Sequence, residues 1–143
     1  MVTSANYLGS PEPQGAIKVQ AEKTAAAITK GDLLNISSGK WQTAATGGSG
    51  PFAVALETKA ASASTVSILR EGIVYVTADG VITPNDPVTV SGSTAGQVIS
   101  NVTPTLANQV GIYLGHENEG DGSTVPTAAA DGDVVRIHFR SGL

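Results

Sequence analysis

The sequence predicts an all-β protein with little helix, a small β-barrel or sandwich built of hairpin units. Short apolar runs rich in Val, Ile and Thr alternate with turns that contain Gly and Ser, and 17 of the 143 residues are glycine. Glycine adopts the positive φ that tight hairpin turns need, so this spacing of signals is typical of antiparallel sheet. A repeat of one hairpin unit within the chain supports the same fold class.

The repeated unit is Thr24–Thr43, and a diverged copy of it follows at Gly80–Ser100. Each copy contains an Ile-Thr pair, a turn that ends in Asp, an apolar strand, a Gly/Ser turn and a second strand. Aligning Asp32 with Asp86 gives an offset of 54 residues. The order of hairpin, apolar strand, polar loop and strand then continues in both halves, which suggests an internal duplication; repeated β-patterning without common ancestry is the alternative.

The first half of the chain is expected to consist mainly of strands. Ala16–Ala21 alternates apolar and polar residues, as a half-buried strand does. Glu22–Thr29 contains three alanines, but it is short and includes three β-branched residues, so we assign it as strand. Thr43–Gly50 and Lys59–Ser64 are expected to be loops. The other expected strands are Leu33–Ile36, Trp41–Thr43, Phe52–Leu56, Thr65–Leu69 and Gly72–Thr77.

The second half repeats this pattern, with one longer connection. Glu117–Asp133 is polar and of low complexity, and we expect it to be an insertion between two strands. The last strand, Val134–Phe139, alternates three apolar residues with Arg136 and His138, which are expected on its solvent side. The expected strands are Val88–Val90, Gln97–Ile99, Gln109–Glu117 and Val134–Phe139.

The N-terminal residues Met1–Gly15 differ from the rest because they are polar and carry two prolines, which favour an extended chain. We expect residues 1–15 to form an extended arm outside the fold and residues 16–143 to form a single β-rich domain. The functional interpretation is a strand donated to a partner, and a frayed terminus is the alternative. The arm residues expected to contact the partner are Val2, Tyr7, Leu8, Pro11 and Pro13.

Composition bounds the class of protein. Aromatic residues make up only 4% of the chain, so the core lacks large side chains and a shared core in an oligomer is worth considering. The net charge is −4 and the eight Lys and Arg residues are scattered, which argues against direct nucleic-acid binding. No run of about 18 apolar residues predicts a membrane span, and no secretory signal is recognised. The chain has no cysteine, which excludes disulfides and thiolate metal sites.

Motifs for catalysis, cofactors and metals are weak, so we predict that the chain is not an enzyme and binds no cofactor. A hydrolase that uses His116 or His138 is one alternative, because triads assemble in space and not along the chain. An acidic set near the C-terminus has the oxygen ligands that Ca²⁺ prefers, but it lacks the spacing of a calcium loop, so a solvated loop is expected. These residues are Glu117, Glu119, Asp121, Asp131 and Asp133.

Trp41, the only tryptophan, ends an expected strand. We expect it to be a core or interface anchor, and hence a candidate oligomer or partner contact; an exposed contact residue is the alternative. Trp41, Tyr75 and Tyr113, together with the acidic loop, also motivate the second function considered, a carbohydrate-binding or adhesin-like β-module.

The chain resembles the small β-rich head decoration, or capsid cement, proteins of tailed bacteriophages, which are similar in role to the lambda head decoration protein. The features that carry the resemblance are the polar arm, the unit AAAITKGDLLNISSGKWQTAA, the segment GIVYVTADGVITPNDPVTV and the closing strand VRIHFRSGL. Together they cover about Gly15–Leu143. The insertion Glu117–Asp133 is longer than the family pattern.

The resemblance implies a structural virion protein that is made in the host cytoplasm and binds the outer surface of an expanded capsid. Such proteins commonly act as homotrimers, contact the major capsid protein and stabilise the shell against internal DNA pressure. A trimer binds through three arms at once, so weak contacts multiply. No catalytic residues come with this family, and none are assigned here.

Overall fold

The structure, a computed structural model, describes residues 7–13, 15–116, 119 and 125–141. Nearly all regular structure in these residues is antiparallel β-sheet, which confirms the predicted fold class. Within the described residues no helix is long and apolar enough to cross a membrane. The strands are β1 (Ile17–Glu22), β2 (Leu33–Ser37), β3 (Lys40–Thr43), β4 (Phe52–Ala55), β5 (Thr65–Thr77), β6 (Pro87–Val90), β7 (Val98–Ser100), β8 (Gln109–Gly115) and β9 (Val134–Arg140).

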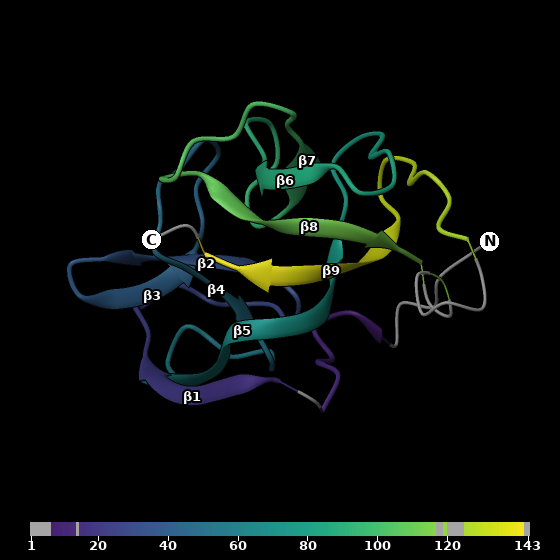
Figure 1. Ribbon diagram of the computed structural model, residues 1–143. Coiled ribbons are helices and arrows are strands. Elements are labelled where there is room, and N and C mark those ends of the chain that lie inside the picture. The colour runs from purple at the N-terminus through teal and green to yellow at the C-terminus, as the bar shows by residue number, and fades with distance from the viewer. Residues whose placement is uncertain (1–6, 14, 117–118, 120–124, 142–143) are drawn as a thin grey trace.

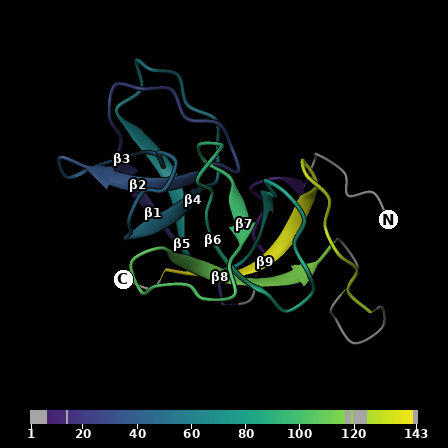
Figure 2. The same cartoon turned by 90° about the horizontal axis from the view of Figure 1, so that it is seen from above.

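The strands form one sheet that curls into a half-barrel, with the order β3-β2-β4-β5-β9-β8-β6-β7 and β1 attached to β5 (Figure 1). Strand β5 has 13 residues and joins the two halves, because its first part pairs with β1 and β4 and its second part pairs with β9. The two strands expected at Thr65–Leu69 and Gly72–Thr77 are therefore one strand. Seen from above, β1–β4 lie on one side of the molecule and β6–β9 on the other (Figure 2).

The internal repeat is present in the strand pairing. The pairs β2–β3, β2–β4 and β4–β5 of the first repeat return as β6–β7, β6–β8 and β8–β9 of the second. The Asp that ends each turn has the same role in both repeats. The Asp32 carboxylate accepts a hydrogen bond from Thr43 Oγ1 at 3.0 Å, and the Asp86 carboxylate accepts one from Ser100 Oγ at 2.6 Å. The duplicated pattern seen in the sequence is therefore a structural repeat.

The starts of the two repeats also correspond. Lys23 N donates to Ser64 O and forms a parallel bridge with Trp41, while Ala78 N donates to Asp133 O and forms a parallel bridge with Val98. Lys23 directly follows β1, and Ala78 directly follows β5. The strand β1 of the first repeat therefore corresponds to the second part of β5, which begins the second repeat. Each repeat thus brings its first strand back to its own hairpin, which is how the sheet curls.

Two apolar clusters pack against the sheet, on opposite faces of β2 and β4, because alternate residues of these strands belong to different clusters. The larger holds residues from both repeats, including Phe52, Val74, Tyr113 and Phe139. The smaller belongs to the first repeat and contains Ile28, Leu34, Trp41, Ala53, Ala55, Val66 and Ile68. Most of these side chains are Val, Ile, Leu or Ala, as the low aromatic content predicts.

The expected strand Glu22–Thr29 is wrong beyond Glu22. The chain leaves the sheet because Lys23 is buried and its ammonium group donates to the carbonyl oxygens of Thr24, Ala60, Ala61 and Ala63 at 2.8 to 3.4 Å. A buried ammonium needs such acceptors. Lys23 thereby holds the loop before β5 against the end of β1.

The segment Tyr7–Pro13 pairs with β5 and does not lie outside the fold. Gly9 N donates to Tyr75 O and Glu12 N donates to Ile73 O, both at 2.8 Å, and Pro11 forms an antiparallel bridge with Val74. The expectation of a separate arm is therefore wrong for these residues, because the edge of β5 offers them backbone acceptors. Val2 lies outside the described residues.

Candidate functional site

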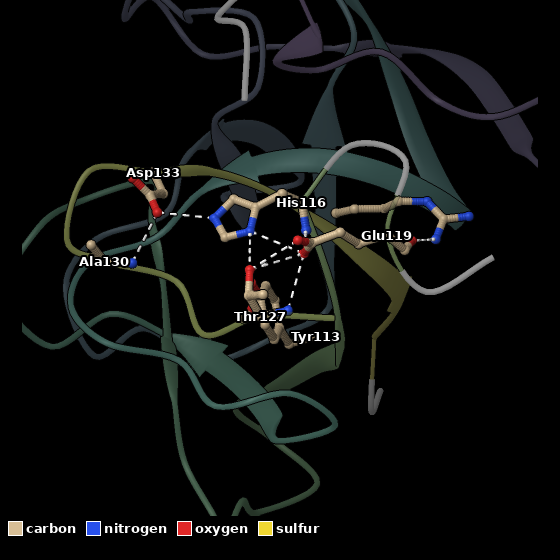
Figure 3. A network of polar contacts seen from close by, with 7 residues as sticks. Tyr113, His116, Glu119, Thr127, Ala130 and Asp133 are labelled. Atoms are coloured by element: carbon tan, nitrogen blue, oxygen red, sulfur yellow. Dashed lines mark hydrogen bonds and ion pairs between the residues drawn. The ribbon is translucent and has the colours of Figure 1, made fainter. Parts of the chain in front are cut away.

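A polar cluster with a buried centre lies where the connection between β8 and β9 packs against the sheet (Figure 3). Most of its side chains come from the end of β8, the start of β9 and the connection between these strands. We name the following residues the polar cluster: Tyr113, His116, Glu119, Thr127, Asp133 and Arg136.

His116 lies at the centre of the polar cluster and is buried. Its Nδ1 is 3.1 Å from Glu119 Oε1 and 3.2 Å from Thr127 Oγ1, and its Nε2 is 3.0 Å from Asp133 Oδ2. Figure 3 shows the ring between Asp133 on one side and Glu119 and Thr127 on the other. Both ring nitrogens thus face acceptors, and neither points toward solvent where a substrate would bind.

Glu119 is the most completely hydrogen-bonded carboxylate of the cluster. Burial raises its pKa, but the backbone N–H groups of His116 and Thr127 and the side chains of the same two residues outweigh burial and lower the pKa to about 2. The backbone N–H groups lie 2.8 and 3.1 Å from Glu119 Oε1. A carboxylate held by several donors is an anchor for the loop that carries it.

Hydrogen bonds, burial and nearby charges also shift the pKa values of Asp133 and Tyr113. The backbone N–H of Ala130 and the side chain of His116 lower the pKa of Asp133. Burial raises the pKa of Tyr113, and the charges of Glu119 and Asp133 raise it further. The Tyr113 hydroxyl donates to Thr127 O at 2.6 Å, so it holds the same connection from the β8 side.

Arg136 extends the polar cluster to the N-terminal segment. Its Nε and Nη2 donate to the two oxygens of Glu12 at 2.5 and 3.1 Å, and its Nη1 donates to Glu119 O at 3.0 Å. The bidentate geometry suits a guanidinium and a carboxylate. The buried Arg136 side chain therefore links β9 to Glu12, 124 positions earlier in the chain, and also to the β8–β9 connection through Glu119 O.

The low pKa of Glu119 predicts a loss of stability in acid. A carboxyl whose pKa is lowered by folding stabilises the protein above its unfolded pKa, here near 4.5, and this contribution disappears as the pH falls through the folded value of about 2. The loss expected between these values is on the order of 3 kcal/mol. Asp133 acts in the same direction, whereas Asp32 acts in the opposite one because burial raises its pKa.

Denaturant titrations at pH 7, 4.5 and 2.5 of the original chain and of Glu119→Gln measure this effect. The amide cannot be protonated over this range, so the variant is less stable at pH 7 and the difference between the two proteins shrinks toward pH 2.5. A constant difference across the whole range would contradict the role assigned to Glu119.

The hydrolase alternative finds no support in the two histidines. His116 is buried, with carboxylates on both sides, and His138 is exposed on β9. The strand register pairs His138 with Ile112, four positions before His116, so the histidines do not share a site. His138 lines a shallow groove of about 450 Å³ on the outer face of β8 and β9, together with Arg140 and Leu106.

The proposed calcium ligands do not converge. Glu119 and Asp133 contact opposite sides of His116, and Asp131 is exposed. Glu117 and Asp121 lie outside the described residues. Within the part of the chain that the structure describes, no three His, Asp or Glu side chains are placed to hold a metal ion.

The aromatic residues that motivated the carbohydrate-binding alternative are buried. Trp41 is only 8% exposed and packs in the smaller cluster with Arg70 over its ring at 5.0 Å; Tyr75 and Tyr113 are buried as well. They therefore provide no open platform for a sugar ring. Trp41 is a core anchor in this chain, and its role between subunits stays a prediction.

The predicted partner-binding residues of the N-terminal segment differ in their surroundings. Tyr7 is exposed, but its ring contacts that of Tyr75 at a centroid distance of 5.3 Å and a tilt of 44°; Leu8 is half-buried over Gly31. Pro11 is half-buried beside β5, while Pro13 is exposed. Leu8 and Pro11 thus attach the segment to its own domain, and binding of a partner by any of these residues stays a prediction.

Sequence reasoning missed the charged residues that hold the fold together. Arg136 was expected on the solvent side of its strand, but it is buried because the N-terminal segment and residue Glu119 cover that side. No local pattern distinguishes Lys23 and Glu12 from ordinary polar residues. The alternation of β9 correctly indicates the two faces of the strand, but it cannot show that both faces are covered.

No protein-family model and no curated protein matches this chain. Among solved structures, the fold is similar to the crystal structure of the N base of head fiber gp8.5 in bacteriophage phi29, with a TM-score of 0.59. The match covers 88% of this chain and 95% of that chain at 15% sequence identity. It therefore spans both repeats and concerns the fold alone.

Proposed function

We propose that this chain is a structural protein of a bacteriophage virion that binds the outer surface of the head. The observation that carries the proposal is the similarity of fold to the base of a phage head fiber over 88% of the chain. The sequence resemblance to head decoration proteins points to the same location independently. In this role the protein is a binding module and has no catalytic activity.

The finer proposal is a homotrimer on the major capsid protein of an expanded head, where it stabilises the shell against DNA pressure. The Arg136–Glu12 ion pair and the hydrogen bond from Arg136 to Glu119 O support this role, because they fasten the N-terminal segment and the β8–β9 connection to the sheet. A rigid module transmits force between its contacts without unfolding locally. Three linked modules would add their weak contacts through effective concentration.

Within the N-terminal segment, Val2 and Tyr7 are the proposed contacts with the capsid. Tyr7 is exposed, and Val2 precedes the part of the segment that pairs with β5. Deleting Met1–Asn6 retains Glu12 and Gly9, whose contacts attach the segment to the domain. This deletion is therefore a sharper test of the arm than removal of the whole segment.

Co-sedimentation with purified phage heads tests the function. The protein is expected to pellet with expanded heads, to bind unexpanded heads more weakly, and to raise the temperature at which expanded heads break. The Met1–Asn6 deletion is expected to weaken binding about tenfold or more while the domain keeps its unfolding midpoint. Absence of the protein from the pellet of expanded heads would refute the proposal, and light scattering of the free protein tests the trimer separately.

A further inference from the structure

Strand β1 has a free edge with exposed apolar side chains. Ile17 and Val19 are 51% and 43% exposed, although β1 belongs to the main sheet through β5. In the described part of the chain, no other strand pairs along β1. Such an edge presents unpaired backbone groups to other chains.

The hydrogen bonds around β5 show which residues of β1 face outward. The backbone groups of Ser67 point toward β4, since its N–H donates to Glu57 and its carbonyl accepts from Leu56 N. The backbone groups of its neighbour Ile68 therefore point toward β1. Val19 pairs with Ile68, so the backbone groups of Val19 point toward β5. By alternation, the backbone groups of Lys18, Gln20 and Glu22 point away from β5.

The second repeat has a filled edge at the corresponding place. Because Lys23 corresponds to Ala78, Lys18 corresponds to Ile73 and Gln20 to Tyr75. The carbonyl oxygen of Ile73 accepts a hydrogen bond from Glu12 N, and that of Tyr75 accepts one from Gly9 N. This edge therefore accepts an extended segment in the second repeat. The difference is visible in burial, since Val74 is fully buried and its counterpart Val19 is not.

The charges along β1 are complementary to those of a second copy. If two β1 strands pair antiparallel about Gln20, Lys18 of each copy lies opposite Glu22 of the other, on the same face of the sheet. Moving the two-fold axis by two residues places Lys18 opposite Lys18 or Glu22 opposite Glu22, which is unfavourable. The Gln20 side chain is held by Thr65 and Ser67 of its own chain, and its backbone groups point away from β5 by the alternation above.

We propose that the outer edge of β1 pairs with β1 of a second copy of this chain, antiparallel and centred on Gln20. The pairing extends the sheet across a two-fold axis and covers Val19 with Ala21 of the other copy. It does not depend on binding to a phage head. Where the protein also forms trimers, the same contact links neighbouring trimers in pairs.

Charge exchange across the two-fold axis tests the pairing. Lys18→Glu places Glu opposite Glu22, and Glu22→Lys places Lys opposite Lys18, so each variant alone should raise the dissociation constant of the pair roughly tenfold. An equimolar mixture of the two variants, or the double variant, should restore the original constant. Lys40→Glu and Asp131→Lys carry the same changes of net charge at other exposed sites and should leave it unchanged.

Analytical ultracentrifugation over a range of protein concentrations measures these constants, and circular dichroism confirms that each variant is folded. An original chain that stays monomeric, or that forms trimers which never pair, would overturn the proposal. Single variants that associate like the original chain, or a mixture that fails to restore association, would overturn it as well. Capsid binding is measured in a separate assay, so failure of either proposal is recognised independently.

Discussion

Replacing Arg136 by Met is expected to lower the free energy of unfolding by about 2 kcal/mol, less than for a fully buried ion pair because the Glu12 side chain is 36% exposed. The substitution leaves the Glu12 carboxylate without its bidentate donors and Glu119 O without the Nη1 donor. Methionine fills much of the same volume, so the cost arises from lost polar contacts and not from a cavity. The N-terminal segment should then open more readily than the rest of the sheet.

Urea denaturation measures the loss for Arg136→Met, and limited proteolysis should show earlier cleavage in the segment Tyr7–Pro13. Arg140→Met is the matched control, because Arg140 lies on the same strand with its side chain 77% exposed and only a 3.7 Å contact with Glu71. An exposed pair of this kind contributes little, so the control should stay within about 0.5 kcal/mol of the original protein. Equal losses in the two variants would contradict the role of Arg136.

Gly111→Ala is expected to destabilise the protein by about 3 kcal/mol, at the upper end for overpacking. A Cβ atom at this position would lie 2.2 Å from His138 O and 3.2 Å from Phe139 Cα. These are backbone atoms of β9, so no side chain can rotate away, and β8 must move from its partner. The loss should appear as a lower unfolding midpoint with an unchanged denaturant slope.

Gly92→Ala provides the control for this substitution. A Cβ atom at Gly92 would meet no heavy atom within 4 Å, and Gly92 is not among the glycines with a positive φ. The variant should therefore be as stable as the original chain or slightly more so, because alanine restricts the unfolded state. If Gly111→Ala unfolded at the same temperature as Gly92→Ala, the close approach of β8 and β9 would be refuted.

The strand pattern could be predicted because it depends on local physics. Alternation of apolar and β-branched residues, interrupted by glycine turns, indicated most of the strands and the repeat about Asp32 and Asp86. The error at Glu22–Thr29 arose because Lys23 bonds to carbonyl groups 37 to 40 positions away, which no local pattern reveals. The division of β5 into two strands was a related error, since both parts of one long strand look complete by themselves.

The polar cluster could be predicted only in part. His116, Glu119 and Asp133 were recognised as candidates for chemistry, but their sequence spacing says nothing about which atoms face one another. His116 and Glu119 are buried because the connection between β8 and β9 folds back over the sheet, where Arg136 and Tyr113 donate hydrogen bonds to it. Tertiary packing therefore turned candidate ligands into structural anchors.

The amino-acid sequence alone determined that this protein is an all-β chain with two similar halves, because side-chain periodicity and glycine turns act over a few neighbouring residues. Only the tertiary structure decided that Tyr7–Pro13 pairs with β5, that Arg136 and His116 are buried, and that the outer edge of β1 stays open. These features depend on contacts between residues up to 124 positions apart, whose free energy exists only once the sheet has curled.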